Sequence, residues 1–460
     1  MNIDVIIIGS GISGLVCAAQ CVKEGLKVII LEKKSKEESI QNRPVKVDKS
    51  VFTEYLNRGP YPREICQDIK AFHVISPEGG KRISYENKNI YGINLQSLRE
   101  SLIEEIESGG GKIYYKAKPK KIKINYNNNI WQIKWRRFLR RKTFYCPVMI
   151  DAAGIHSTYR KKYSIEKGLL AIGPEWICQS LHGEYRVTNE WGPLSSNESY
   201  SIVGRHSLLS IQHFFYDKTE DKLVYVLGAL KKTPNPIQVG LPILKSELFS
   251  FINVISKDVL YEKIGQIPLK HSALALVNDG YMMIGDSAFL TNSQYVSGVA
   301  SAIISAKLAA KTIIYIYRNN MEFNYHNLYS YSHEYMMTRG KQMLETHAQM
   351  RFAMNFSRKE MEKFFKNGFI KAIDLEKILK GQKQNYGLKT IFRKFYPIVR
   401  DMRLSYKIAK NFSYYQDFKK HLEQFPYFPS KDELIVYSRT TIKLLNKIYN
   451  PHEANRKVMK

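Results

Sequence analysis

Three glycines near the N-terminus, Gly9, Gly11 and Gly14, have the spacing of a loop that holds a diphosphate. In such a loop the first glycine allows a tight turn, and the second lets the backbone approach the phosphates. The third lets the following helix pack closely, so that its free N–H groups face the negative charge. Glu32 follows at the distance where a carboxylate accepts hydrogen bonds from a ribose. The pattern predicts a site for an adenine dinucleotide.

The strands and the helix that would position these residues can be predicted from the same stretch of sequence. A run of apolar residues, Val5–Ile8, precedes the glycines and reads as a buried strand. A helix of small residues follows, then Gly25, then a second apolar strand, Val28–Leu31, which ends at Glu32. A lone GxGxxG pattern is weak evidence, but here strand, helix, second strand and acid follow in register, which favours dinucleotide binding over a glycine-rich turn.

Two later segments repeat the strand-and-turn pattern. Residues 148–160 read V-M-I-D-A-A-G-I-H-S-T-Y-R, and residues 281–310 begin with Y-M-M-I-G-D-S-A. In the second segment an apolar strand ends at Gly285 and Asp286, whose carboxylate can accept from ribityl or ribose hydroxyls, and Gly298 opens the next helix toward a ligand. Taken alone, the segment fits an N-capping aspartate equally well. Together with the N-terminal unit, the order of the three segments describes one cofactor.

The pattern predicts an α/β fold: a Rossmann-like nucleotide-binding domain assembled from separated segments, a β-rich domain inserted in it, and a helical C-terminal region. We expect nucleotide-binding segments at 1–165 with a β-rich excursion at about 46–94, and a β-rich substrate domain at 166–264. Completion of the nucleotide-binding domain is expected at 265–318, and a helical region at 319–460.

The 460-residue chain has 71 Lys and Arg against 42 Asp and Glu, a formal net charge of +29. This excess has two readings: a lysine-rich proteome, or attraction to an anionic partner. We favour a phospholipid surface over nucleic acid, because no nucleic-acid-binding module is present in the sequence. The five cysteines lack metal spacing and read as reduced thiols, so we expect no metal and a cytoplasmic protein, peripheral to the membrane at most.

With these motifs the chain resembles the geranylgeranyl reductase family of FAD-dependent oxidoreductases, within the group that includes aromatic-ring hydroxylases and flavin halogenases. The resemblance covers residues 1–312. It is carried by the glycine loop, D-A-A-G-I-H-S, the Gly285-Asp286 strand, Y-G-I-N-L-Q-S-L-R-E-S-L at 91–102, and I-G-Q-I-P-L at 264–269.

The resemblance implies FAD as cofactor, an external electron donor of unknown identity, and an isoprenoid or isoprenoid-lipid alkene as substrate. It implies pyrophosphate at the glycine loop, adenosine ribose at Glu32, adenine near the backbone of Ala117, and the flavin at the turn ending at Gly298. The residues expected to bind the cofactor are Gly9, Ser10, Gly11, Ile12, Ser13, Gly14, Glu32, Lys33, Gln96, Ala117, Asp286, Gly298 and Val299.

The sequence departs from the family pattern at several positions. Phe289, Ser293 and Val296 stand in the flavin loop where Gly, Pro and Gly are typical, and a β-branched residue resists the conformations that glycine allows there. An arginine common ahead of the helix at 95–106 is replaced by Leu95, with Gln96 beside it as a possible substitute. Val47 stands where archaeal members often carry cysteine, and no Y-x-W-x-F-P-like substrate motif is found in 176–264.

No catalytic residue stands out from the sequence. Tyr295 and Asn292 lie in the flavin loop and are candidates to face the ring, although polar loop residues are commonly solvated or capping. Three functions stay open: a reductase of isoprenoid or lipid alkenes, a flavin-dependent monooxygenase, and a degenerate protein that binds FAD or lipid without turnover. The sequence does not specify the oligomeric state.

Overall fold

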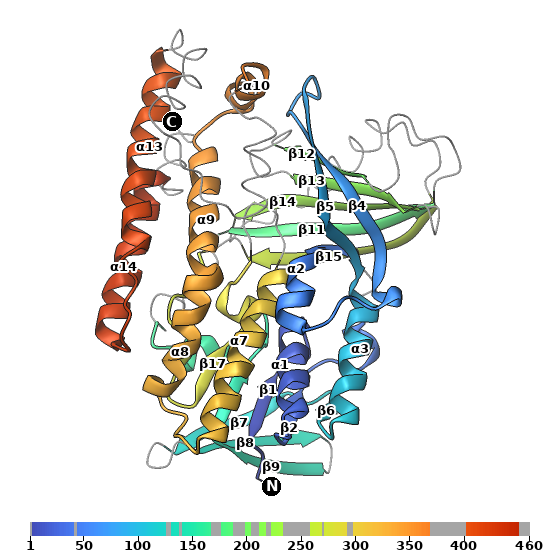
Figure 1. The fold of residues 1–460 in the computed structure, drawn as a ribbon, viewed down its shortest axis with the longest axis vertical. Coiled ribbons are helices and arrows are strands. Elements are labelled where there is room, and N and C mark those ends of the chain that lie inside the picture. The colour runs from blue at the N-terminus through green and yellow to red at the C-terminus, as the bar shows by residue number, and fades with distance from the viewer. Residues whose placement is uncertain are drawn as a thin grey trace.

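The computed structural model describes residues 2–40, 44–125, 130–137, 140–166, 176–186, 198–203, 211–217, 222–232, 258–268, 271–291, 298–368 and 402–449. Their strands form three sheets, and helices cover the first sheet and one side of the molecule (Figure 1). The α/β fold, with a strand-rich insert and a helical C-terminal region, is the predicted class.

The first sheet has six strands in the order β16-β17-β10-β1-β2-β6, parallel except for β16. Its central strands are apolar and fully buried, as expected for a parallel sheet covered on both faces. Helices α1, α3 and α7 pack together beside it, with α1 in contact with both others. These elements are β1 (Val5–Ile8), α1 (Ile12–Lys23), β2 (Val28–Leu31), α3 (Leu95–Ser108), β6 (Lys112–Tyr114), β10 (Val148–Asp151), β16 (Val277–Asn278), β17 (Tyr281–Met283) and α7 (Val299–Arg318).

The second sheet has eight strands in the order β15-β11-β14-β13-β12-β4-β5-β3. All its pairs are antiparallel except β12 with β4, where residues 198–202 lie beside residues 71–75. The β-rich excursion and the inserted domain therefore form one continuous sheet. Its strands are β3 (Pro44–Asp48), β4 (Ile65–Ile75), β5 (Arg82–Asn94), β11 (Trp176–Arg186), β12 (Glu198–Val203), β13 (Ile211–Asp217), β14 (Lys222–Lys232) and β15 (Asp258–Pro268).

A three-stranded antiparallel sheet packs behind β10, where its two tryptophans, Trp131 and Trp135, are buried. It consists of β7 (Pro119–Asn125), β8 (Ile130–Arg137) and β9 (Arg140–Cys146). Short helical turns connect the main elements: η1 (Glu37–Ser39), α2 (Lys49–Val51), η2 (Phe52–Leu56), η3 (Pro62–Glu64), α4 (Tyr159–Tyr163), η4 (Gly285–Ala288) and η5 (Met336–Gly340).

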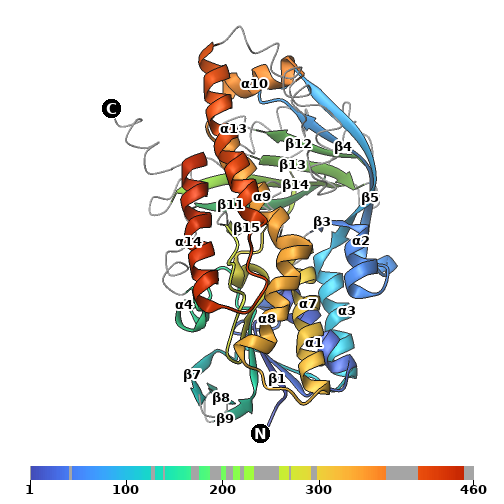
Figure 2. The ribbon, with the colours of Figure 1, turned by 60° about the vertical axis from the view of Figure 1, so that its left-hand side comes forward.

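The C-terminal helices run along one side of the molecule and span both large sheets (Figure 2). They are α8 (Tyr325–Tyr335), α9 (Lys341–Ala353), α10 (Arg358–Lys366), α13 (Met402–Leu422) and α14 (Lys431–Ile448). The buried carboxylate of Glu166 connects α14 to the segment before β16. It accepts from the Leu274 and Ala275 N–H groups at 3.0 and 2.9 Å and from the Ser438 hydroxyl of α14.

Helix α7 is long and apolar enough to cross a membrane by length and composition alone, but its most apolar stretch is 67% buried inside the protein. It packs against α1 and α8, and its two lysines are held by polar partners. Lys307 Nζ lies 2.5 Å from Gln20 Oε1, and Lys311 Nζ lies 2.6 Å from Glu334 Oε1. Helix α7 is therefore a core helix beside the parallel sheet.

Candidate cofactor site

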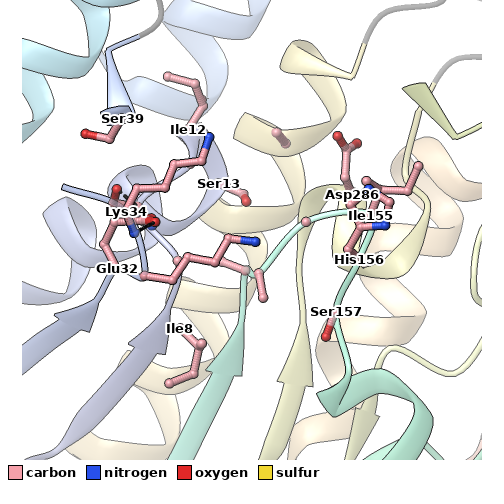
Figure 3. Close-up of a pocket in the computed structure, with 18 of the residues that line it drawn as sticks. Ile8, Ile12, Ser13, Glu32, Lys34, Ser39, Ile155, His156, Ser157 and Asp286 are labelled. Carbon is pink, nitrogen blue, oxygen red and sulfur yellow. Dashed lines mark hydrogen bonds between the residues drawn. The ribbon is translucent and has the colours of Figure 1, made fainter. Parts of the chain in front are cut away.

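A cavity of about 480 Å³ opens at the carboxyl ends of β1, β2 and β10, the edge of a parallel sheet where ligands bind in doubly wound folds. Figure 3 shows Glu32 and Lys34 on one side of it and Asp286 with His156 on the other. Residues from the first, second and third predicted segments thus line one cavity, and strand residues Val45, Gln266 and Ile267 of the large sheet complete its wall.

The glycine loop has the close contacts that its residue types imply. Gly9 has φ +108°, and a Cβ there would lie 2.3 Å from the carbonyl oxygen of Ala152. A Cβ on Gly14 would lie 2.2 Å from the Gly9 oxygen, so α1 begins directly against the turn. A Cβ on Gly11 would meet nothing within 4 Å. Two glycines therefore allow the packing, while Gly11 leaves space beside the amino end of α1 for a phosphate group.

The Glu32 carboxylate is buried, and three hydrogen bonds fix its orientation. Its Oε2 accepts from Ser10 N at 2.8 Å and Ser10 Oγ at 2.9 Å, and its Oε1 accepts from Lys34 N at 2.9 Å. These bonds join the glycine loop to the turn after β2. A carboxylate has about four acceptor positions, so Glu32 can still accept from a ribose hydroxyl. Lys33, Lys34 and Lys118 surround this end of the cavity with positive charge.

Asp286 marks the far end of the cavity. Thr291 Oγ1 donates to Asp286 Oδ1 at 2.8 Å, and a Cβ at Gly298 would lie 3.0 Å from the same oxygen. Gly285 has φ +61°, and a side chain there would collide with Ser13 Oγ at 2.6 Å. The turn before α7 is therefore packed against the start of α1. Both helix N-termini face one cavity, with a carboxylate at each end.

Ten of the expected cofactor residues line the cavity, and three do not: Gly14, Gln96 and Ala117. Gly14 instead allows α1 to pack against the Gly9 carbonyl of the glycine loop, as described above. Gln96 Nε2 donates instead to Glu100 Oε1 at 2.8 Å on the same helix. The Ala117 N–H donates to the Glu32 carbonyl at 2.7 Å, and its neighbours Lys118 and Pro119 form the wall. The flavin-loop residues Asn292, Ser293, Tyr295 and Val296 lie outside the described residues.

Sequence reasoning missed Arg99, which lies one helical turn after Leu95 on α3. Its side chain is 2% exposed and lines the cavity, and its Nη1 donates to the Ser10 carbonyl. Its Nε has no hydrogen-bond partner among the described atoms. Burial lowers the pKa of the guanidinium, and the nearby Tyr115 and Glu32 oppose that shift. The (i, i+4) spacing from Leu95 could have identified it, because residues four apart share a helix face.

Phe289, an unexpected residue in the flavin loop, has a structural partner. It is buried with φ +56°, and its ring lies 4.0 Å from the guanidinium carbon of Arg160. Arg160 also donates to the carbonyls of Ser287 and Ile155, so it fastens η4 to the segment after β10. A cation–π contact of a desolvated arginine contributes about 2 kcal/mol. Phe289 therefore stabilises the turn through this contact.

Asp151, at the end of β10, makes hydrogen bonds that hold the segment after this strand in place. Its buried carboxylate accepts from Ser157 Oγ at 2.5 Å, Tyr281 OH at 2.7 Å and Ala153 N at 3.0 Å. Burial raises the pKa of this carboxyl, and the three hydrogen bonds oppose the shift. With its oxygens engaged by the protein, Asp151 orients the residues that follow β10 and lies behind the cavity wall.

These groups fit an extended dinucleotide. Open backbone at Gly11, two helix N-termini and a buried guanidinium suit a pyrophosphate. Glu32 and Asp286 supply acceptors for sugar and ribityl hydroxyls at the two ends.

Comparisons with known proteins support the same cofactor. Residues 4–41 match a family model described as an FAD binding domain. Digeranylgeranylglycerophospholipid reductase 2 of Methanococcoides burtonii is 23% identical over 319 residues, covering 67% of this chain and 74% of that protein. Digeranylgeranylglycerophospholipid reductase of Sulfolobus acidocaldarius is 22% identical over 387 residues, covering 82% of each chain.

Solved structures have the same fold. A geranylgeranyl bacteriochlorophyll reductase-like protein from Thermoplasma acidophilum superposes with a TM-score of 0.69 at 16% identity, over 86% of this chain and 98% of that one. PqsL, a probable FAD-dependent monooxygenase from Pseudomonas aeruginosa, gives 0.57 at 17% identity, over 80% and 100%. With the cavity described above, these likenesses make FAD the cofactor. The chain is an FAD-dependent oxidoreductase, similar in sequence to digeranylgeranylglycerophospholipid reductases and in fold to a geranylgeranyl bacteriochlorophyll reductase-like protein.

Proposed function

We propose that the protein reduces carbon–carbon double bonds of an isoprenoid lipid. The observation that carries this proposal is the way the eight-stranded sheet borders the cofactor cavity. Val45 comes from β3 at one edge of that sheet, and Gln266 and Ile267 come from β15 at the other edge. Both edges of the sheet therefore reach the cofactor cavity.

The same sheet carries a second cluster of buried apolar residues on one of its faces. Sheet residues pack there against α10, α13 and the end of α9, and nearly all of these side chains are aromatic or aliphatic. The cluster consists of Phe72, Val74, Ile83, Tyr85, Phe356, Met361, Phe364, Phe365, Leu404 and Ile408. An isoprenoid chain has no polar groups, so a wall of this composition suits it. The names of the sequence relatives support the same substrate class.

When bound and reduced, FAD supplies a hydride to such an alkene. The residues of the chain hold the cofactor and keep water away from it. Arg99 and the amino end of α1 would hold the pyrophosphate, and Glu32 and Asp286 would accept from hydroxyl groups. An external donor has to return two electrons to the flavin after each turnover.

The test is an anaerobic reaction followed by visible spectroscopy and mass spectrometry. The FAD-loaded protein is reduced with dithionite, the excess is removed, and a geranylgeranylated glycerophospholipid in detergent is added. We expect the flavin absorbance to return and the lipid to gain one pair of hydrogen atoms per reduced double bond. Reoxidation only by oxygen, stimulated by an aromatic compound, would support a monooxygenase like the Pseudomonas neighbour instead.

We also propose that the protein works in the cytoplasm at the surface of an anionic membrane. The net charge of +29 supports attraction to acidic lipids. Tyr427 and Phe428, between α13 and α14, are 71% and 73% exposed next to Lys431, a combination suited to a headgroup layer. Flotation with phosphatidylglycerol vesicles tests this. We expect binding that 0.5 M salt (roughly a 4 Å screening length) reverses and that Y427S/F428S weakens. Equal binding to phosphatidylcholine would contradict it.

A further inference from the structure

Two of the sequence motifs that carry the family resemblance meet at the wall of the cofactor cavity. They are D-A-A-G-I-H-S at 151–157, which leaves β10, and I-G-Q-I-P-L at 264–269, which includes the end of β15. His156 Nε2 in the first motif lies 3.0 Å from Gln266 Oε1 in the second. Both side chains line the cavity. One hydrogen bond therefore connects the nucleotide-binding region to the large sheet beside the cofactor site.

The turn that carries His156 is held on both sides of this residue. Before it, the carbonyl of Ile155 accepts from Arg160 Nη2 at 2.9 Å. After it, Ser157 Oγ donates to the buried carboxylate of Asp151 at 2.5 Å. The His156 side chain itself is exposed. The imidazole therefore extends into the cavity wall from a backbone that other residues fix in place.

Gln266 belongs to an edge strand of the large sheet. In the described sheet β15 is the first strand in the order and pairs with β11. Gln266 and Ile267 both line the cavity, although successive side chains of a strand point to opposite faces. The cavity therefore borders the edge of β15 and not one of its faces. Ladder hydrogen bonds hold a strand edge only where another strand pairs with it, so the bond to His156 is a restraint on this edge.

The chemistry of the two side chains sets the direction of the bond. An amide oxygen only accepts, so His156 Nε2 carries the proton and donates it to Gln266. The bond therefore selects one tautomer of the imidazole and orients its ring. Figure 3 shows His156 on the same side of the cavity as Asp286, opposite Glu32 and Lys34. A cofactor that extends from Glu32 to Asp286 would have this bond in one wall of its site.

We propose that the His156–Gln266 hydrogen bond controls the exchange of FAD. It holds the edge of β15 against the turn after β10, and it breaks each time the cavity opens to admit or release the cofactor. Both residues are positioning residues, and the inference rests on FAD as the cofactor and not on the proposed substrate. Because the bond forms between two protein side chains, it forms with and without FAD. Its loss therefore accelerates binding and release together, whereas loss of a direct contact with FAD would raise the Kd.

The experiment measures both rates by flavin fluorescence, after mixing apoprotein with FAD and after dilution of the FAD-loaded protein. H156F keeps an aromatic ring without the donor, and Q266M keeps the side-chain length without the acceptor. Each should raise both rates about 2- to 12-fold, the factor that matches about 0.5–1.5 kcal/mol for one hydrogen bond at about 1.4 kcal/mol per tenfold. The Kd, which is the ratio of the two rate constants, should stay within about twofold of wild type.

The double variant distinguishes one shared bond from two independent effects. Because H156F and Q266M remove the same bond, H156F/Q266M should exchange FAD no faster than either single variant. Q266E keeps an acceptor oxygen for His156, so its rates should equal those of wild type or be slower. Wild-type rates in both single variants, additive effects in the double variant, or a raised Kd with an unchanged binding rate would each overturn the proposal.

Gln132 provides the matched control. It also lies on a strand, β8, and its Nε2 donates to Tyr145 OH at 2.9 Å on an exposed face, apart from the residues that line the cavity. Q132M removes a side-chain hydrogen bond of similar length and should keep the wild-type rates and Kd. No lipid is present in this experiment, so its failure leaves the proposed reductase function in place. Failure of the lipid reaction described above, with normal FAD exchange, would contradict the proposed function alone.

Discussion

Replacing Arg99 with methionine should weaken FAD binding while leaving the fold intact. The guanidinium is buried in the cavity wall and donates to the Ser10 carbonyl in the glycine loop. Methionine fills similar space but removes both the positive charge and the donor. The glycine loop would then lose its hydrogen bond from α3, and a bound pyrophosphate would lose a buried positive charge in the cavity wall.

The size of the effect follows from the kind of interaction. A hydrogen bond that involves a charged group contributes about 1.5–3 kcal/mol. At about 1.4 kcal/mol per factor of ten, R99M should raise the Kd for FAD about 10- to 150-fold. R99K keeps the charge without the planar fork, so its Kd should lie between wild type and R99M. The assay is titration of apoprotein with FAD, followed by quenching of flavin fluorescence.

Arg63 supplies the control for this measurement. It contacts α3 from outside, through Glu104 at 2.6 Å and Ser101 at 3.0 Å, and its side chain is 49% exposed. R63M removes an arginine from the same helix contact without touching the cavity, and its Kd should stay within about twofold of wild type because exposed ion pairs contribute little. A folded R99M protein with a Kd within threefold of wild type would refute the assignment of Arg99 to the pyrophosphate.

Three further predictions use other parts of the structure. G14A should lower both thermal stability and flavin content, since its Cβ would lie 2.2 Å from the Gly9 oxygen, whereas G11A should lower flavin content alone, as measured by melting curves and absorbance. F289G should lower the melting temperature, because losing a buried ring costs about 3–5 kcal/mol while relieving the φ of +56° returns about 1–3 kcal/mol. For Lys46, burial lowers the pKa to about 7 from 10.5, so between these values the unfolded chain holds a proton that the folded chain has released. Urea unfolding should then show wild type gaining stability relative to K46M as pH rises through this window, by at most about 1.4 kcal/mol per unit, and a difference independent of pH would contradict the shift.

The nucleotide-binding core was predictable because its signals are local. The glycine loop, the strand ending at Glu32 and the Gly285-Asp286 turn each combine a strand, a turn and a helix start within one stretch of sequence. Parallel strands that are connected by helices bring their carboxyl ends to one edge of the sheet, so the turns after these strands must lie together there. The cavity at that edge contains residues from all three segments.

The rest depended on contacts between distant parts of the chain. Nothing near residues 71–75 indicates that residues 198–202 pair with them in parallel, so the excursion and the insert looked like separate pieces. The pairing follows from packing around a shared core, which strand propensity does not encode. Arg99 was overlooked for a similar reason: its inward direction is set by the Ser10 carbonyl, and only the fold brings that group to α3.

The departures from the family pattern bear on whether the protein is an active enzyme or a degenerate relative. A chain released from selection for cofactor binding would lose site residues without replacement. Here Leu95 lacks the expected arginine, yet Arg99 places a guanidinium in the cavity from the next turn of the same helix. Phe289 replaces a glycine and tolerates a positive φ, yet its ring covers Arg160, which fastens the same turn. At these two positions the changed residue therefore has a buried arginine close by, Arg99 on the same helix as Leu95 and Arg160 against the ring of Phe289. Compensation of this kind is expected of a site that still binds FAD.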